Sequence, residues 1–196
     1  MELYLHSDVT SDQDNGVDFR MAAKFVKELH AAERSKEKNL VIHLETLGGE
    51  WTDGMWIYDA IALSSLPATM ICHGIVCSMG TVIMQAAKKR LLMPHCDLMV
   101  HHGSLTVSGP QLSVESEMKY NVKIKNIMLD IYAERCQNGK FFKDRGDSRS
   151  KTRAYIKRKI ETHGDWYLNP EEAVEFGFAD GILSKTKYLN VRQVSQ

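Results

Sequence analysis

The hydrophobic and polar positions of this chain follow two spacings, and together they predict its secondary structure. Short, nearly continuous apolar runs rich in β-branched residues predict buried strands. Apolar residues that recur every three or four positions predict helices with one face against a core. The predicted strands are residues 2–6, 39–45, 68–74 and 97–102, and the predicted helices are residues 17–34, 55–63, 78–88, 112–135, 150–162 and 170–177.

Up to residue 102, strands and helices take turns along the chain. This alternation indicates an α/β domain whose parallel strands are joined by right-handed crossovers. The polar segment Ser11–Gly16 is expected to form a turn after the first strand. With 196 residues, 43% of them hydrophobic, the chain is expected to form a single domain, residues 1–196, around a substantial core.

The segment after Gly103 has a different character. Apolar residues of the helix predicted from Leu112 to Arg135 are spread too widely around it for a one-sided surface helix. We therefore expect this helix to leave the globular body and to pack against another subunit. Residues 141–150 are predicted to be a charged loop that carries two phenylalanines.

Composition and charge indicate no special class of partner. Lysine plus arginine and aspartate plus glutamate number 25 each, so nothing indicates binding to nucleic acid or to a membrane. The basic clusters 88–90 and 153–159 are interpreted as solvated helix faces. No apolar run is long enough to span a membrane and no secretory signal is recognisable, so a cytoplasmic location is expected. Four cysteines without metal-ligand spacing are predicted to be buried free thiols: Cys72, Cys77, Cys96 and Cys136.

Ser78 is the candidate nucleophile because it lies where a predicted strand passes into a predicted helix. A serine at such a transition can point its hydroxyl into a cleft, beside the free amides of the first helical turn. Those are the requirements of an acyl-transfer nucleophile. Serine also serves as a helix N-cap, and on local sequence alone the cap is the commoner role.

A nucleophilic serine needs a base and a group that orients the base. His101 and His102 lie at the end of a strand, where only one of the two can face Ser78. A metal site made of His95, Cys96 and these two histidines is a weaker alternative, since their spacing lacks a metal-binding pattern. For the orienting acid, spacing leaves three candidates, and two backbone amides are needed for the oxyanion. The acids are Asp165, Asp180 and Asp130, and the amides are those of Met79 and the Gly48-Gly49 turn.

Four segments of the chain resemble the proteolytic subunit of the Clp protease, the ClpP family. They occur in the family's order and span roughly residues 39–183. An ordinary α/β-hydrolase is disfavoured, because Val76 interrupts the GxSxG motif and the order Ser, His, Asp differs from that of hydrolases. The resembling segments are the glycine turn and helix at 47–60, the nucleophile segment at 74–80, the histidine strand at 98–101 and the aspartate segment at 165–177.

The resemblance implies a serine endopeptidase that cleaves peptides and unfolded proteins. It implies a crotonase-like α/β spiral with a protruding handle helix at about residues 112–136, and a reaction that needs no metal or organic cofactor. It also implies homo-oligomers: heptameric rings that stack through their handles into a tetradecamer, whose chamber is fed by a Clp ATPase. The residue roles that it implies are nucleophile Ser78, base His101 rather than His102, acid Asp165, and oxyanion amides Gly49 and Met79.

Several positions depart from the family pattern. Leu47 replaces the proline before the paired glycines, Gly164 replaces an arginine, and Ser104–Pro110 replaces a glycine-rich strand. The loop at 139–151 is expected to be longer than usual, and little chain precedes the first strand to form axial loops. These departures weaken the expectation of double rings and of unfoldase docking, and they fit a divergent, for example phage-encoded, homologue.

Other functions stay open at this stage. The chain could be a non-catalytic or regulatory ring subunit that mixes with a standard host ClpP. It could also be a crotonase-type acyl-CoA enzyme, which would not need the Ser-His-Asp set. Two further alternatives are a phage capsid-maturation protease and a signal-peptide-peptidase relative, the latter disfavoured because no membrane segment is predicted.

Overall fold

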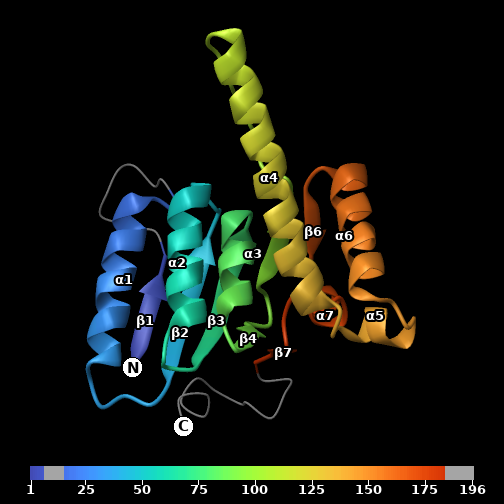
Figure 1. Ribbon diagram of the computed structural model, residues 1–196. Helices are drawn as coiled ribbons and strands as arrows, with labels where there is room; N and C mark the ends of the chain where they lie inside the picture. Colours follow the sequence, from blue (N-terminus) through green and yellow to red (C-terminus); the bar gives the residue numbers. More distant parts are fainter. Residues whose placement is uncertain (7–15, 184–196) are drawn as a thin grey trace.

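The chain folds around one seven-stranded sheet with helices packed against it (Figure 1). This computed structural model describes residues 1–6 and 16–183. Most of the predicted turn at 11–16 therefore lies outside the described residues. The elements in chain order are β1 (Glu2–Leu5), α1 (Phe19–Glu33), β2 (Leu40–Thr46), α2 (Trp51–Leu63), β3 (Ala68–Cys77), α3 (Met79–Ile83), the 3-10 turn η1 (Met84–Ala86), β4 (Lys89–Leu92), β5 (Asp97–Val100), α4 (Gln111–Cys136), α5 (Lys140–Asp144), α6 (Arg149–His163), β6 (Trp166–Leu168), α7 (Pro170–Glu175) and β7 (Gly181–Ile182).

Strand β3 divides the sheet into two branches. Strands β1, β2, β3, β4 and β7 follow one another in parallel. The first part of β3, Thr69–Cys72, pairs with β4, whereas its last part, Ile75–Cys77, pairs with β5. Gly74 lies between the two parts at φ +51°, a backbone angle that glycine tolerates best. Strand β6 then adds to β5 in antiparallel direction. The α/β fold class predicted from the sequence is confirmed.

Helices α1, α2 and α3 lie side by side across one face of the strands (Figure 1). Helix α1 begins where the Asp18 carboxylate accepts a hydrogen bond from the Met21 amide. Its apolar stripe is fully buried, as the helical spacing predicts. The side chains of this stripe are Ala22, Phe25, Val26, Leu29 and Ala32.

Helix α4 extends well beyond the globular body, as predicted (Figure 1). Its 26 residues correspond to a length of about 39 Å. All of its buried residues lie in the C-terminal third: Met128, Leu129, Tyr132, Ala133 and Cys136. The N-terminal part instead exposes large apolar side chains, namely those of Leu112, Met118 and Val122. The helix therefore carries apolar surface that nothing in a single described chain covers.

The interpretation of residues 88–90 as a solvated helix face was wrong, because Lys89–Leu92 forms strand β4. Arg90 is only 4% exposed, and its guanidinium lies 2.5 Å from the Asp180 carboxylate. The same guanidinium donates to the Gly177 carbonyl at 2.9 Å and to Gln85. Burial alone would raise the pKa of Asp180, but the hydrogen bonds and charge of Arg90 outweigh it and leave that pKa below its usual value.

Other boundaries also differ from the prediction. Helix α2 begins at Trp51, four residues before the predicted start, and the helix after Ser78 lasts five residues before it tightens into η1. The predicted loop at 141–150 contains helix α5, and both of its phenylalanines pack in an aromatic cluster with Tyr155 and Phe176. Aromatic packing therefore orders a segment whose charges alone indicated a loop.

The four cysteines are free and buried, as predicted. Burial raises the pKa of Cys96 and of Cys136 to about 12, so both thiols are neutral at physiological pH. Among the described residues, no helix combines the length and the apolar character that spanning a membrane requires.

We expect Asp180→Ala to destabilise the fold by about 2–3 kcal/mol, because it leaves the buried Arg90 guanidinium without its counter-ion. Urea unfolding at one fixed protein concentration would measure this loss. In Arg90→Met/Asp180→Ala the unpaired charge is also removed, so part of the stability should return. A double variant as unstable as the sum of both single variants would contradict this account.

Candidate active site

Ser78 occupies the junction between β3 and α3 in an unusual backbone conformation. Its φ of +52° is the only positive φ of a non-glycine residue among those described. Such a conformation is costly and is concentrated at functional sites. Ser78 occupies the N-cap position of α3, but its side chain makes no capping hydrogen bond. Its hydroxyl instead lies 2.7 Å from Nε2 of His101.

The register of β5 brings Ser78, His101 and Asp165 together. The ladder pairs Cys77 with Met99, and the Ser78 amide then donates to the Met99 carbonyl at 2.8 Å. On the other side of β5, Val100 pairs with Trp166, so the next residues outward are His101 and Asp165. Nδ1 of His101 lies 3.1 Å from a carboxylate oxygen of Asp165. One imidazole thus contacts a hydroxyl through one nitrogen and a carboxylate through the other.

The two other candidates for the orienting acid, Asp180 and Asp130, form ion pairs away from His101. Asp180 pairs with Arg90 at the β4 branch, and Asp130 pairs with Arg153 at 2.7 Å between α4 and α6. His102 contacts neither Ser78 nor Asp165 by any hydrogen bond of the described chain. Burial, and after it the charge of Lys125, lowers the pKa of His102, which favours a neutral imidazole.

The glycine turn after β2 lies directly against Ser78. A Cβ atom on Gly48 would come 2.5 Å from the Cβ of Ser78, and one on Gly49 would come 2.2 Å from the Val17 carbonyl oxygen. Both glycines also have positive φ, +105° and +147°. The Thr46 hydroxyl accepts a hydrogen bond from the Gly48 amide at 3.1 Å. Only glycine therefore fits at either position.

Hydrogen bonds to Val17 orient the Gly49 amide away from that residue. Val17 donates to the Gly48 carbonyl at 2.7 Å and accepts from the Glu50 amide at 2.8 Å. In this parallel bridge the amide of Gly49 itself points to the opposite side. The Met79 amide belongs to the first residue of α3 and has no acceptor within the helix. Gly49 and Met79 both line the cleft around Ser78.

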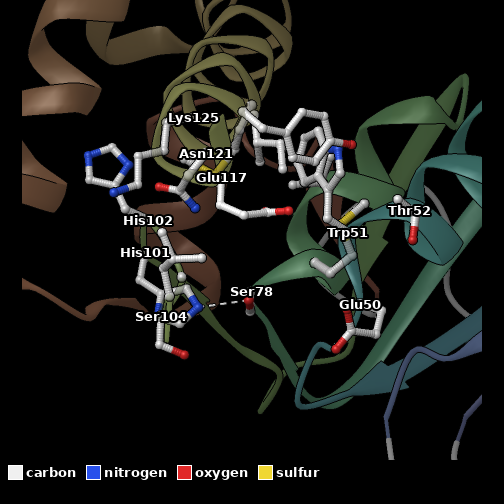
Figure 2. A pocket seen from close by; sticks show the side chains of 18 residues that line it. Glu50, Trp51, Thr52, Ser78, His101, His102, Ser104, Glu117, Asn121 and Lys125 are labelled. Carbon is white, nitrogen blue, oxygen red and sulfur yellow. Dashed lines mark hydrogen bonds between the residues drawn. The ribbon is translucent and has the colours of Figure 1, made fainter. Parts of the chain in front are cut away.

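A cleft of about 480 Å³ opens above Ser78 and is walled on one side by α4 (Figure 2). Side chains from α2, α3, α4 and the segment after β5 contribute to it. The buried side chains of Met79, Val82 and Met128 contribute apolar surface to its lining. The remaining lining residues are Gly49, Glu50, Trp51, Thr52, His101, His102, Gly103, Ser104, Leu105, Glu117, Tyr120, Asn121, Ile124 and Lys125.

Sequence reasoning missed the contribution of α4 to this cleft. Glu117, Asn121, Ile124 and Met128 are three or four positions apart, so they lie on one face of the helix. The spacing is visible in the sequence, but two of its four members, Glu117 and Asn121, are polar, so an apolar pattern does not reveal it. Within the described part of the chain, no group of three or more histidine, cysteine, aspartate or glutamate residues could hold a metal ion, the set around His95 included.

Comparison with known proteins now gives the family of the chain. The Clp protease family model matches residues 12–186, so the chain belongs to the Clp protease family, and the resemblance seen in the sequence is confirmed. It is therefore a ClpP-like peptidase. The ATP-dependent Clp protease proteolytic subunit of Deinococcus radiodurans is 26% identical over 174 residues, covering 87% of this chain and 78% of that protein. The ATP-dependent Clp protease proteolytic subunit 1 of Chlamydia muridarum is 28% identical over 169 residues, covering 84% and 80%.

We expect Gly48→Ala to displace the glycine turn from Ser78, because the new methyl group has no room beside the serine. The substitution should cost more than 2 kcal/mol of stability or open the turn, and should reduce peptide cleavage at least tenfold. Gly146→Ala is the matched control, since Gly146 also has positive φ (+63°) but no atom near its Cβ position. The control should cost about 1 kcal/mol and leave cleavage unchanged. Equal effects of both variants would contradict the close-contact explanation.

Proposed function

We propose that the protein is a serine endopeptidase with Ser78 as nucleophile, His101 as general base and Asp165 as the group that orients it. The observation that supports this most is the continuous contact from the Ser78 hydroxyl through both nitrogens of His101 to Asp165, at 2.7 and 3.1 Å. Ser, His and Asp in this mutual geometry are recognised by their roles, whatever their order in the chain.

In the proposed reaction, Ser78 Oγ attacks the carbonyl carbon of a peptide bond in the cleft. Nε2 of His101 takes the hydroxyl proton and later gives it to the nitrogen of the leaving amine. The Asp165 carboxylate accepts a hydrogen bond from Nδ1 and stabilises the imidazolium formed in between. Water then hydrolyses the acyl-enzyme by the same route, with His101 again as the base.

The negative charge on the carbonyl oxygen develops beside two backbone amides in this proposal. The amides of Gly49 and Met79 supply these hydrogen bonds, because both line the cleft next to Ser78 and neither has an acceptor in its own turn. A single donor of this kind is typically worth about 3 kcal/mol of transition-state stabilisation. The buried Cys77 next to the serine is no competing nucleophile, since burial and the charge of Asp165 raise the pKa of its thiol.

We further propose that copies of the chain form the rings expected from the family, that these rings stack through α4, and that the cleft faces the enclosed chamber. The exposed apolar side chains of Leu112, Met118 and Val122 support a subunit contact on α4. The names of the relatives describe ATP-dependent proteases, which supports a Clp ATPase as the partner that delivers unfolded proteins. A cytoplasmic location belongs to the same proposal.

We expect a fluorophosphonate probe to label Ser78, with the adduct located by mass spectrometry. His101→Ala should abolish labelling, and Asp165→Asn should slow it about a hundredfold to ten-thousandfold, because the imidazole loses its orienting carboxylate. His95→Ala replaces an exposed histidine outside the cleft and should label normally. Absence of labelling in every assembled form, or labelling that persists in His101→Ala, would overturn the proposal.

We expect native mass spectrometry to detect a seven-subunit ring or its double. Met118→Asp places a charge in the exposed apolar part of α4 and should convert double rings into single rings, whereas Met118→Leu should leave assembly unchanged. A stable monomer under all conditions would contradict the ring, and double rings in Met118→Asp would contradict the α4 contact.

A further inference from the structure

The cleft above Ser78 carries an unpaired carboxylate. Glu117 lines this cleft from α4 and makes no hydrogen bond or ion pair with any other described residue. Its neighbour Glu115, by contrast, accepts a hydrogen bond from Gln111 and does not line the cleft. Figure 2 shows the Glu117 side chain extended across the opening above Ser78, toward the side formed by Trp51.

The acidic and basic side chains that line the cleft lie on different sides of it. Glu50 and Glu117 are the acidic lining residues, and Lys125 is the basic one. Figure 2 places Lys125 beside His102, on the far side of the opening from Trp51. The charge of Lys125 also contributes to the lowered pKa of His102, which agrees with that position. The space above Ser78 on the Trp51 side is therefore bordered by negative charge.

Part of the lining of this cleft is apolar. Met79, Val82 and Met128 are each less than 10% exposed and line the cleft, and Ile124 adds a further apolar side chain from α4. Trp51 and Tyr120 add aromatic faces to the lining. A lysine or arginine side chain fits a cleft with apolar, aromatic and carboxylate groups in its lining. Its methylene stem favours apolar contact, and its charged tip favours a carboxylate or an aromatic face.

We infer that this cleft selects substrates with a basic side chain on the residue whose carbonyl Ser78 attacks, and that Glu117 is the residue that determines this specificity. The inference rests on the proposed function and names its substrate class. Glu117 acts on binding of the side chain and takes no part in the proton transfers. Because Glu117 is exposed to solvent in the described chain, its charge is partly screened and its effect should be moderate.

The test compares three peptides that differ at this one residue, which is lysine, norleucine or glutamate. Norleucine has the unbranched aliphatic shape of lysine without the charge, so the ratio of kcat/KM for lysine over norleucine isolates the electrostatic contribution. The wild-type protein, in its native assembly, should favour lysine about fivefold and should disfavour glutamate. Raising the ionic strength should reduce the ratio.

Two variants and a matched control assign the preference to Glu117. In Glu117→Gln the lysine to norleucine ratio should fall to about one, and in Glu117→Lys the glutamate peptide should become the better of the charged substrates. Glu115→Gln removes the same charge two residues away, outside the cleft, and should keep the wild-type ratio. A general loss of folding would lower cleavage of all three peptides together and would leave the ratio unchanged.

The outcomes separate the inference from the function on which it rests. A wild-type ratio near one, or a ratio that survives in Glu117→Gln, overturns the role of Glu117 even if all peptides are cleaved. Fluorophosphonate labelling of Ser78 without cleavage of the lysine peptide also overturns it, while the proposed nucleophile stands. If Ser78 is not labelled and no peptide is cleaved, the proposed function fails, and the substrate preference fails with it.

Discussion

The site depends on one constraint, the simultaneous pairing of β5 with β3 and with β6. Ser78 follows the strand on one side of β5, Asp165 precedes the strand on the other side, and His101 follows β5 itself. Each of the three residues is therefore placed by backbone hydrogen bonds of a sheet. A slip of one residue in β5 would turn His101 to the opposite face and bring His102 forward, so the ladder also decides which histidine reaches the serine.

The glycine turn is held to this sheet in an unexpected way. A proline usually precedes the paired glycines in the family, and its replacement by Leu47 indicated a looser turn. Leu47 is 68% exposed and contributes little, but Thr46 and Val17 fix the turn by hydrogen bonds to its backbone on both sides of Gly49. Rigidity that proline would supply through its ring is supplied here by the partners of the turn.

The sequence predicted the fold class and the candidate residues better than the elements between them. Strand ends and family motifs mark Ser78, His101 and Asp165 as candidates in the sequence, but the register that brings them together depends on pairings between distant strands. Strand β4 was missed since Arg90 resembles a surface charge until its partner Asp180, 90 residues away, is known. Helix α5 was missed for a similar reason, because Phe142 is ordered by aromatic residues of α6 and the segment after α7.

Helix α4 lines the cleft with one face and exposes large apolar side chains on another. Successive residues are about 100° apart around a helix, so Glu117, Asn121 and Met128 lie on the cleft side, whereas Val122 and Leu112 point away from it and Met118 lies at the edge between the two faces. With the roles proposed for these two faces, a substitution on the cleft face changes which peptides are accepted and leaves the proposed subunit contact intact, and the reverse also holds. The proposed peptide preference and the proposed assembly are therefore separable by mutation, although both depend on the same few turns of one helix.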